Sequence, residues 1–159
     1  MFLKNKGFTL LEVLITVIIL AVGLLGLAGL QVKSMRNNLS SEHRSQAALL
    51  AYDMADRIRS NQKQAKLGNA SRYVGNIPTA ASAAALGCNT LATACSWSSI
   101  AEVDLAEWQN TLTNTLPGAS ASGAISSLDG VFTITVNWDD NRDGNTDASD
   151  ALFTLSFQP

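Results

Sequence analysis

An apolar run near the N-terminus constrains this chain more than any other feature. From Val13 to Leu30 the only polar side chain is Thr16, and twelve of the eighteen residues are leucine, isoleucine or valine. At about −0.3 to −0.6 kcal/mol each, these twelve contribute roughly −4 to −7 kcal/mol to membrane insertion. A helix over residues 8–30 would be about 35 Å long, enough to cross a hydrocarbon core of about 30 Å. The run therefore predicts a transmembrane segment.

A cleaved secretory signal is the alternative interpretation, because Lys4 and Lys6 precede the run. Such signals have an apolar stretch of about 7 to 15 residues, followed by a cleavage site of small residues. Here the run is longer, and residues 30–33 offer no such site. We therefore expect the segment to be retained. The positive-inside rule then places residues 1–7 in the cytoplasm and the chain after Gln31 on the outer side.

The composition agrees with a membrane-tethered protein that has little catalytic equipment. Hydrophobic residues make up 47% of the chain and charged residues only 15%, against about 25% charged in typical soluble domains. A net charge of −2 argues against nucleic-acid binding. The single histidine, His43, is expected on the polar side of a helix, and no nucleophile motif accompanies it. We therefore do not expect an enzyme.

Glu12 is the exception in the apolar segment. A charged side chain in the membrane needs a cationic partner or a proton, and residues 13–30 contain no lysine, arginine or histidine. The partner must then come from outside this helix. The alternative is a glutamate at the membrane surface that lipid headgroups and water solvate.

The residues around Glu12 form a specific pattern of basic leader, glycine, aromatic residue and glutamate, in the order Lys6-Gly7-Phe8-Thr9-Leu10-Leu11-Glu12-Val13. This stretch resembles the class III signal of type IV prepilins and pseudopilins. The resemblance implies that a prepilin peptidase cuts after Gly7 and methylates Phe8. It also implies that Glu12 pairs with the N-terminal amine of a neighbouring subunit as the chain docks into a filament. An ion pair between subunits relieves two charges that are each costly alone.

The same resemblance implies three segments: a cleaved leader over 1–7, a transmembrane and filament-core helix over 8–31, and a periplasmic or extracellular head over 32–159. Apolar residues at three- and four-residue steps beyond Val32 predict that the helix continues, now amphipathic, to about Lys66, with Gly68-Asn69 as its end.

Two segments near the C-terminus alternate apolar and polar residues, 132–138 and 153–157, and both are predicted strands with one apolar face. Asp129-Gly130 is a hairpin signal, which makes 124–128 a third strand. The expected fold is α+β: a long N-terminal helix packed on a small antiparallel sheet, as in the pilin fold.

Residues 68–103 show no sustained period, and we expect them to form loops. Cys88 and Cys95 lie there. On the outward-facing side of a membrane the compartment is oxidising, which favours a disulfide over two free thiols. After this region, Asp104 and Glu107 have the spacing of a capping box, which predicts a short helix over 104–116.

The segment between the last two strands, 139–150, is rich in aspartate. It has oxygen side chains at loop positions one, three, five, nine and twelve and glycine at position six, the spacing of an EF-hand calcium loop. Position seven would donate a main-chain carbonyl. The alternative is an acidic hairpin tip that water solvates. The candidate Ca²⁺ ligands are Asp139, Asn141, Asp143, Asn145, Asp147 and Asp150.

Two further stretches, 104–109 leading to Leu116-Pro117-Gly118 and 23–31, resemble the PilV group of minor pilins. The resemblance implies a minor pilin that helps other minor pilins to prime a type IV pilus and supports twitching motility and adhesion. Its partners would be other minor and major pilins, the prepilin peptidase, the inner-membrane assembly platform and, before assembly, membrane lipid. It would sit in the inner membrane as a single-pass protein and then in the pilus at the cell surface. The alternatives are a minor pseudopilin of a type II secretion system and a calcium-dependent surface-binding module.

Overall fold

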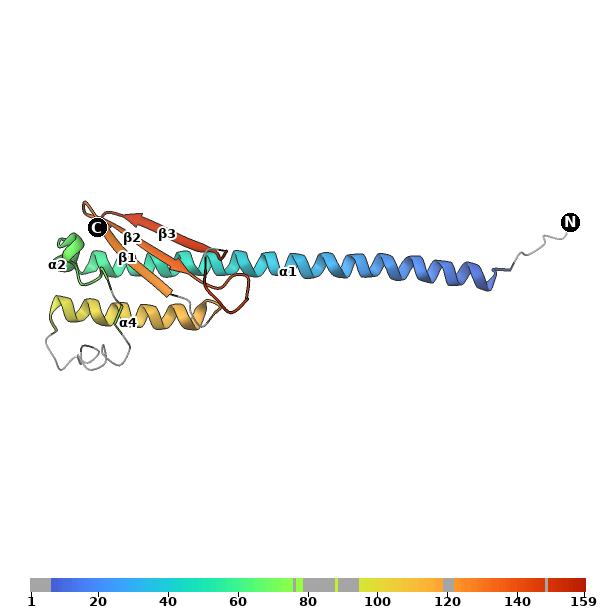
Figure 1. Cartoon of the computed structure of the whole chain (residues 1–159), viewed down its shortest axis with the longest axis horizontal. Coiled ribbons are helices and arrows are strands. Elements are labelled where there is room, and N and C mark those ends of the chain that lie inside the picture. Colours follow the sequence, from blue (N-terminus) through green and yellow to red (C-terminus); the bar gives the residue numbers. More distant parts are fainter. Residues whose placement is uncertain (1–6, 76, 79–87, 89–94, 119–121, 148) are drawn as a thin grey trace. The chain divides into compact units, whose positions relative to one another are not determined.

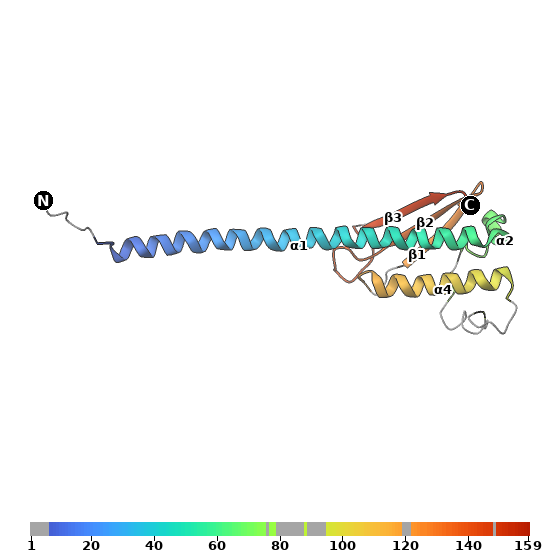
Figure 2. The same cartoon turned by 180° about the vertical axis from the view of Figure 1, so that it is seen from behind.

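The computed structural model describes residues 7–75, 77–78, 88, 95–118, 122–147 and 149–159. Figures 1 and 2 show the elements from opposite sides. In chain order they are α1 (Leu10–Ser60), α2 (Gln62–Ala65), the 3-10 turn η1 (Gly68–Ala70), α4 (Trp97–Thr115), β1 (Ser122–Leu128), β2 (Val131–Asn137) and β3 (Leu152–Phe157).

The chain divides into two compact units, Met1–Ser40 and Ser41–Pro159. The first unit contains the N-terminal part of α1, where every described residue from Gly7 to Leu39 is exposed to the surroundings. A window of eighteen residues in this helix has a mean hydropathy of 2.8 and includes no buried residue. Length and apolarity therefore agree with the transmembrane segment that the sequence predicts.

The second unit is built on a three-stranded antiparallel sheet in the order β1-β2-β3. Ile134 in the central strand pairs with Ile125 of β1 and with Leu155 of β3. β1 and β2 are joined by Asp129 and Gly130, whose φ angles of 50° and 78° match the primed turns that two-residue hairpins require. The hairpin and the third strand are thus confirmed, and β1 begins two residues earlier than predicted.

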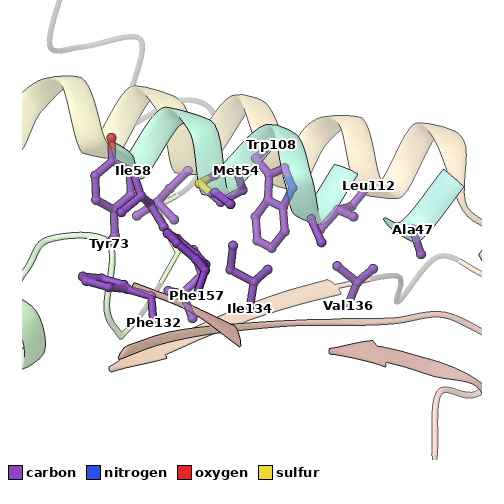
Figure 3. Packing of buried hydrophobic residues seen from close by; sticks show 14 of the residues in the cluster. Ala47, Met54, Ile58, Tyr73, Trp108, Leu112, Phe132, Ile134, Val136 and Phe157 are labelled. Atoms are coloured by element: carbon purple, nitrogen blue, oxygen red, sulfur yellow. The ribbon is translucent and has the colours of Figure 1, made fainter. Parts of the chain in front are cut away.

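The C-terminal part of α1 and all of α4 pack on one face of this sheet (Figures 1 and 3). Strict alternation in β2 buries Phe132, Ile134 and Val136. Met54 and Trp108 approach them from the two helices (Figure 3). The predicted α+β fold, a long helix on a small antiparallel sheet, is confirmed.

The long helix ends at Ser60 rather than at Lys66, because Asn61 interrupts it. Asn61 is almost fully buried, and its ψ of 64° is not helical. Its amide group donates a hydrogen bond of 2.8 Å to the carbonyl of Trp97, while its side-chain oxygen accepts from the Gln64 N–H at the start of α2. The interruption is therefore stabilised by partners on both sides.

The helix predicted over 104–116 begins earlier, at Trp97, so the expected loop over 68–103 is wrong for its last seven residues. Ser96 is the cap: its hydroxyl accepts the Ser99 N–H at 3.1 Å. Asp104 lies inside α4 and does not cap it. The error arose because the segment before Asp104 carries too many small polar residues to show a helical apolar period.

Candidate assembly site and the loops of the head

The assembly residues lie where α1 begins. Thr9 precedes the helix, and its hydroxyl accepts the main-chain N–H of Glu12 at 3.3 Å. The carbonyl of Thr9 accepts the same N–H at 3.1 Å and that of Val13 at 3.3 Å. A threonine followed three residues later by a glutamate is a capping-box spacing, which our sequence interpretation overlooked although both residues are in the pattern.

This cap places Glu12 in the first turn of α1, where the partial positive charge of the helix N-terminus stabilises a carboxylate. Glu12 and Phe8 line a surface hollow of about 310 Å³ together with Val13 and Thr16. The Phe8 side chain is 83% exposed. The carboxylate of Glu12, the ring of Phe8 and the hollow that they line therefore form one accessible surface at the start of the helix.

Comparison with known families covers most of this region and the segment after it. A model of the prokaryotic N-terminal methylation motif matches residues 3–28, and a type IV pilin model, Tt1218-like, matches residues 29–106. The two matches adjoin and together span the long helix and the start of the head. The chain belongs to the type IV pilin family. Neither a curated protein nor a solved structure matched it.

Family membership gives the pilin a structural role and no enzymatic activity, which confirms the prediction that it is not an enzyme. A pilin with this motif resides first in a membrane and then in a pilus, and requires a pilus assembly machinery. The methylation-motif match includes Gly7, Phe8 and Glu12. Their roles in cleavage, methylation and docking stay predictions.

The disulfide of the pilin joins Cys88 and Cys95, whose Cα atoms are 5.7 Å apart, and confirms that pairing. Cys95 immediately precedes Ser96, the cap of α4. The bridge therefore closes a short loop at the start of α4 and leaves β3, at the end of the chain, without a covalent link.

The acidic loop 139–150 is organised by its own main chain. The buried carboxylate of Asp139 accepts N–H groups from Arg142, Asp143 and Gly144. The carboxylate of Asp150 accepts N–H groups from Asp140, Asn141 and Asp147. These main-chain N–H groups offset part of the repulsion between the neighbouring aspartates.

The predicted ligands of the acidic loop do not converge on one point. In the part of the chain that the structure describes, no group of three or more histidine, cysteine or acidic side chains is placed to hold a metal ion. The oxygens at loop positions one and twelve, from Asp139 and Asp150, are already occupied by main-chain donors. The structure thus explains the conformation of the loop without a metal, and calcium binding stays a prediction.

Arg57 is the centre of a polar cluster that sequence analysis missed. Its guanidinium group contacts three carboxylates: Asp53 at 3.0 Å, Asp104 at 3.2 Å and Glu107 at 3.0 Å. Partial burial lowers the pKa of Arg57, but the bonds to these carboxylates outweigh it and raise the pKa overall. The cluster holds α4 against α1, since Asp104 and Glu107 belong to α4.

Tyr73 completes this cluster from the segment after η1. It is fully buried, and its hydroxyl donates a hydrogen bond of 2.6 Å to the second carboxylate oxygen of Asp104. Burial raises the pKa of Tyr73, and the bond to Asp104 raises it further. Tyr73 therefore stays neutral as a donor throughout the physiological pH range.

The expectation that His43 lies on the polar side of the helix is wrong. Its side chain is partly covered, and both ring nitrogens are out of contact with solvent and without a hydrogen-bond partner among the residues described. His43 lies one turn before the buried Ala47, so it belongs to the apolar stripe of α1. The sequence did not show this because its neighbours Glu42 and Arg44 are charged.

Proposed function

We propose that this chain is a minor pilin of a type IV pilus, of the PilV type, which helps other minor pilins to prime assembly and supports twitching motility and adhesion. The observation that carries its assembly role is Glu12, an accessible carboxylate in the first turn of a helix. The residues after it are mostly apolar, and none is charged before Lys33. An acid in that setting is satisfied when a cation arrives from another molecule.

The family resemblance implies that this cation is the processed N-terminal amine of a neighbouring subunit. The hollow beside Phe8 and Glu12 is open to such a neighbour. The position of the disulfide supports a minor rather than a major subunit, because major pilins tend to close a loop near the C-terminus with their cysteines. Here Cys88 and Cys95 precede α4.

The docking role is tested by replacing Glu12 with alanine in the full chain and measuring its amount in membranes and in sheared pili. We expect Glu12→Ala to insert and to be processed, but to be depleted from pili. Glu42→Ala removes a carboxylate from the same helix beyond the span and serves as the control. Normal incorporation of Glu12→Ala would show that the ion pair is not needed.

The processing prediction is tested by the mass of the mature polypeptide, which should begin at a methylated Phe8. A mature chain that begins at another residue contradicts the filament-subunit proposal.

Deletion of the gene tests whether the subunit belongs to a type IV pilus or to a type II secretion system. Loss of surface pili and twitching supports a minor pilin, and quantitative mass spectrometry of sheared pili should then find it at a small fraction of the major subunit. Loss of exoprotein export with normal piliation would instead identify a pseudopilin of a type II secretion system.

Calcium binding by the acidic loop is a separate proposal, supported by the spacing of its oxygen side chains alone. A loop of the extracellular kind would have a dissociation constant on the order of 0.1 to 1 mM. Titration of the full chain with calcium, followed by heat release and thermal stability, tests it. Asp143→Asn should weaken any response. The absence of a response in the unmodified chain would contradict calcium binding by this loop.

A further inference from the structure

The helix α1 carries two cations immediately after its apolar run. Between Glu12 and Glu42 the only charged residues are Lys33 and Arg36, and Leu30 is the last residue of the run. Both side chains are exposed. Neither forms a hydrogen bond or an ion pair with any residue that the structure describes. These two charges are therefore available to a ligand from outside the chain.

The two cations border a hollow in the helix surface. It has a volume of about 500 Å³ and is lined by Gly29, Val32, Lys33, Arg36 and Asn37. Lys33 and Arg36 are three residues apart, so they lie on neighbouring turns of one face. Gly29 has no side chain, and no atom lies within 4 Å of the position that a Cβ would occupy there. The hollow thus has an apolar end toward the span and a cationic end away from it.

We propose that Lys33 and Arg36 bind the phosphate of an anionic phospholipid. The part of its acyl chain nearest the headgroup then lies along Gly29 and Val32. The position of the pair decides the class of ligand: it begins three residues after Leu30, and a rise of 1.5 Å per residue places it about 5 Å beyond the end of the run, at headgroup depth. Arginine offers a phosphate two parallel N–H donors, and lysine adds a compact charge. Their aliphatic stems also tolerate the apolar boundary.

This site holds the chain at a defined depth before assembly, since each cation near an anionic membrane surface contributes to binding. The site depends on α1 residing in a membrane and not on the proposed role in priming. Failure of the one can therefore be distinguished from failure of the other, because the assay below contains no pilus components.

The test uses the full chain in phosphatidylcholine vesicles with a tryptophan reporter at Met35→Trp. Met35 is 65% exposed and lies between the two cations in the sequence, but it does not line the hollow. Quenching of the added tryptophan by a small fraction of brominated phosphatidylglycerol is compared with quenching by brominated phosphatidylcholine. The chain without Met35→Trp supplies the background from the three natural tryptophans.

We expect the anionic lipid to quench at a lower mole fraction than the neutral one. The difference should be about 25-fold in the chain that carries both cations, and about fivefold in a chain that carries only one of them. Lys33→Gln with Arg36→Gln should abolish this preference. Lys33→Arg should retain it, which shows that the substituted helix still inserts. Lys63→Gln with Lys66→Gln, an equal change of charge beyond the span, should also leave it intact.

Equal quenching by the two lipids in the chain that retains Lys33 and Arg36 would overturn the proposal. So would an equal loss of preference in the Lys63 and Lys66 control, because the effect would then follow net charge. Loss of the preference in excess inorganic phosphate would instead assign the pair to a free anion. Lys4 and Lys6 cannot produce the local signal, since they precede the span and the reporter follows it.

Discussion

A methyl group added at Gly123 tests the packing of the head most directly. Gly123 lies in β1 and faces α4. A Cβ built there would overlap Cη2 and Cζ3 of Trp108 and come within 3.0 Å of Cδ1 of Leu112. The indole ring cannot move aside freely, because Trp108 is 1% exposed and its ring N–H donates to the carbonyl of Leu50 at 2.9 Å. We therefore expect Gly123→Ala to displace the ring and break that bond.

The expected cost follows from these two effects. Overpacking of a tight core costs about 1 to 3 kcal/mol, and a lost hydrogen bond of a buried group about 1 kcal/mol. Gly123→Ala should thus lower the free energy of unfolding by about 3 kcal/mol. Trp108→Leu alone should cost a similar amount, because it removes the ring and leaves a cavity. In the double variant the added methyl group occupies part of that cavity, so the two costs should fall about 2 kcal/mol short of their sum.

The assay is urea unfolding of the full chain in a mild detergent, followed through the fluorescence of the buried Trp138. Ser126→Ala is the matched control: it lies in the same strand, is exposed, and should change the free energy of unfolding by no more than about 0.5 kcal/mol. A cost for Gly123→Ala as small as that of the control, or strict additivity in the double variant, would refute the reasoning.

Other predictions concern single contacts of the head. Ser96→Ala removes the cap of α4 and should cost about 1 kcal/mol in the same unfolding assay, whereas Ser96→Thr should cost much less. Because the folded state raises the pKa of Tyr73, its contribution to stability is complete below the unfolded value of about 10 and is lost above it, by up to about 1.4 kcal/mol per pH unit. Tyr73→Phe should therefore flatten the decline in stability above pH ~10, and an unchanged slope would contradict the raised pKa. Replacing Cys88 and Cys95 by serine should cost about 2.5 kcal/mol, the loop entropy that the bridge removes, and should make stability insensitive to reductant.

Features that depend on neighbouring residues could be predicted from the sequence. Apolarity over 13–30 indicates the transmembrane helix, since the free energy of membrane insertion is close to a sum over the individual residues. Period-two alternation in β2 indicates which side chains are buried, because successive residues of a strand face opposite sides. Asp129-Gly130 locates the hairpin through the left-handed backbone that this turn requires.

Other features depended on residues far apart in the chain. Asp104 and Glu107 have the spacing of a cap, but they lie inside α4 and bind Arg57, 47 and 50 residues away. Asn61 ends α1 because the carbonyl of Trp97, 36 residues later, accepts its amide. Local pattern alone does not reveal such partners.

The sequence by itself thus determined the membrane segment, the processing motif and the alternating strands, because each follows from local periodicity or from a short contiguous pattern. Only the tertiary structure decided where α1 ends and where α4 begins. It also decided that Gly123 must lack a side chain, because it lies beside Trp108. Finally, it decided that main-chain N–H groups bind the carboxylates of the acidic loop. The physical reason is that close packing and hydrogen bonding act between surfaces that meet only after the chain has folded.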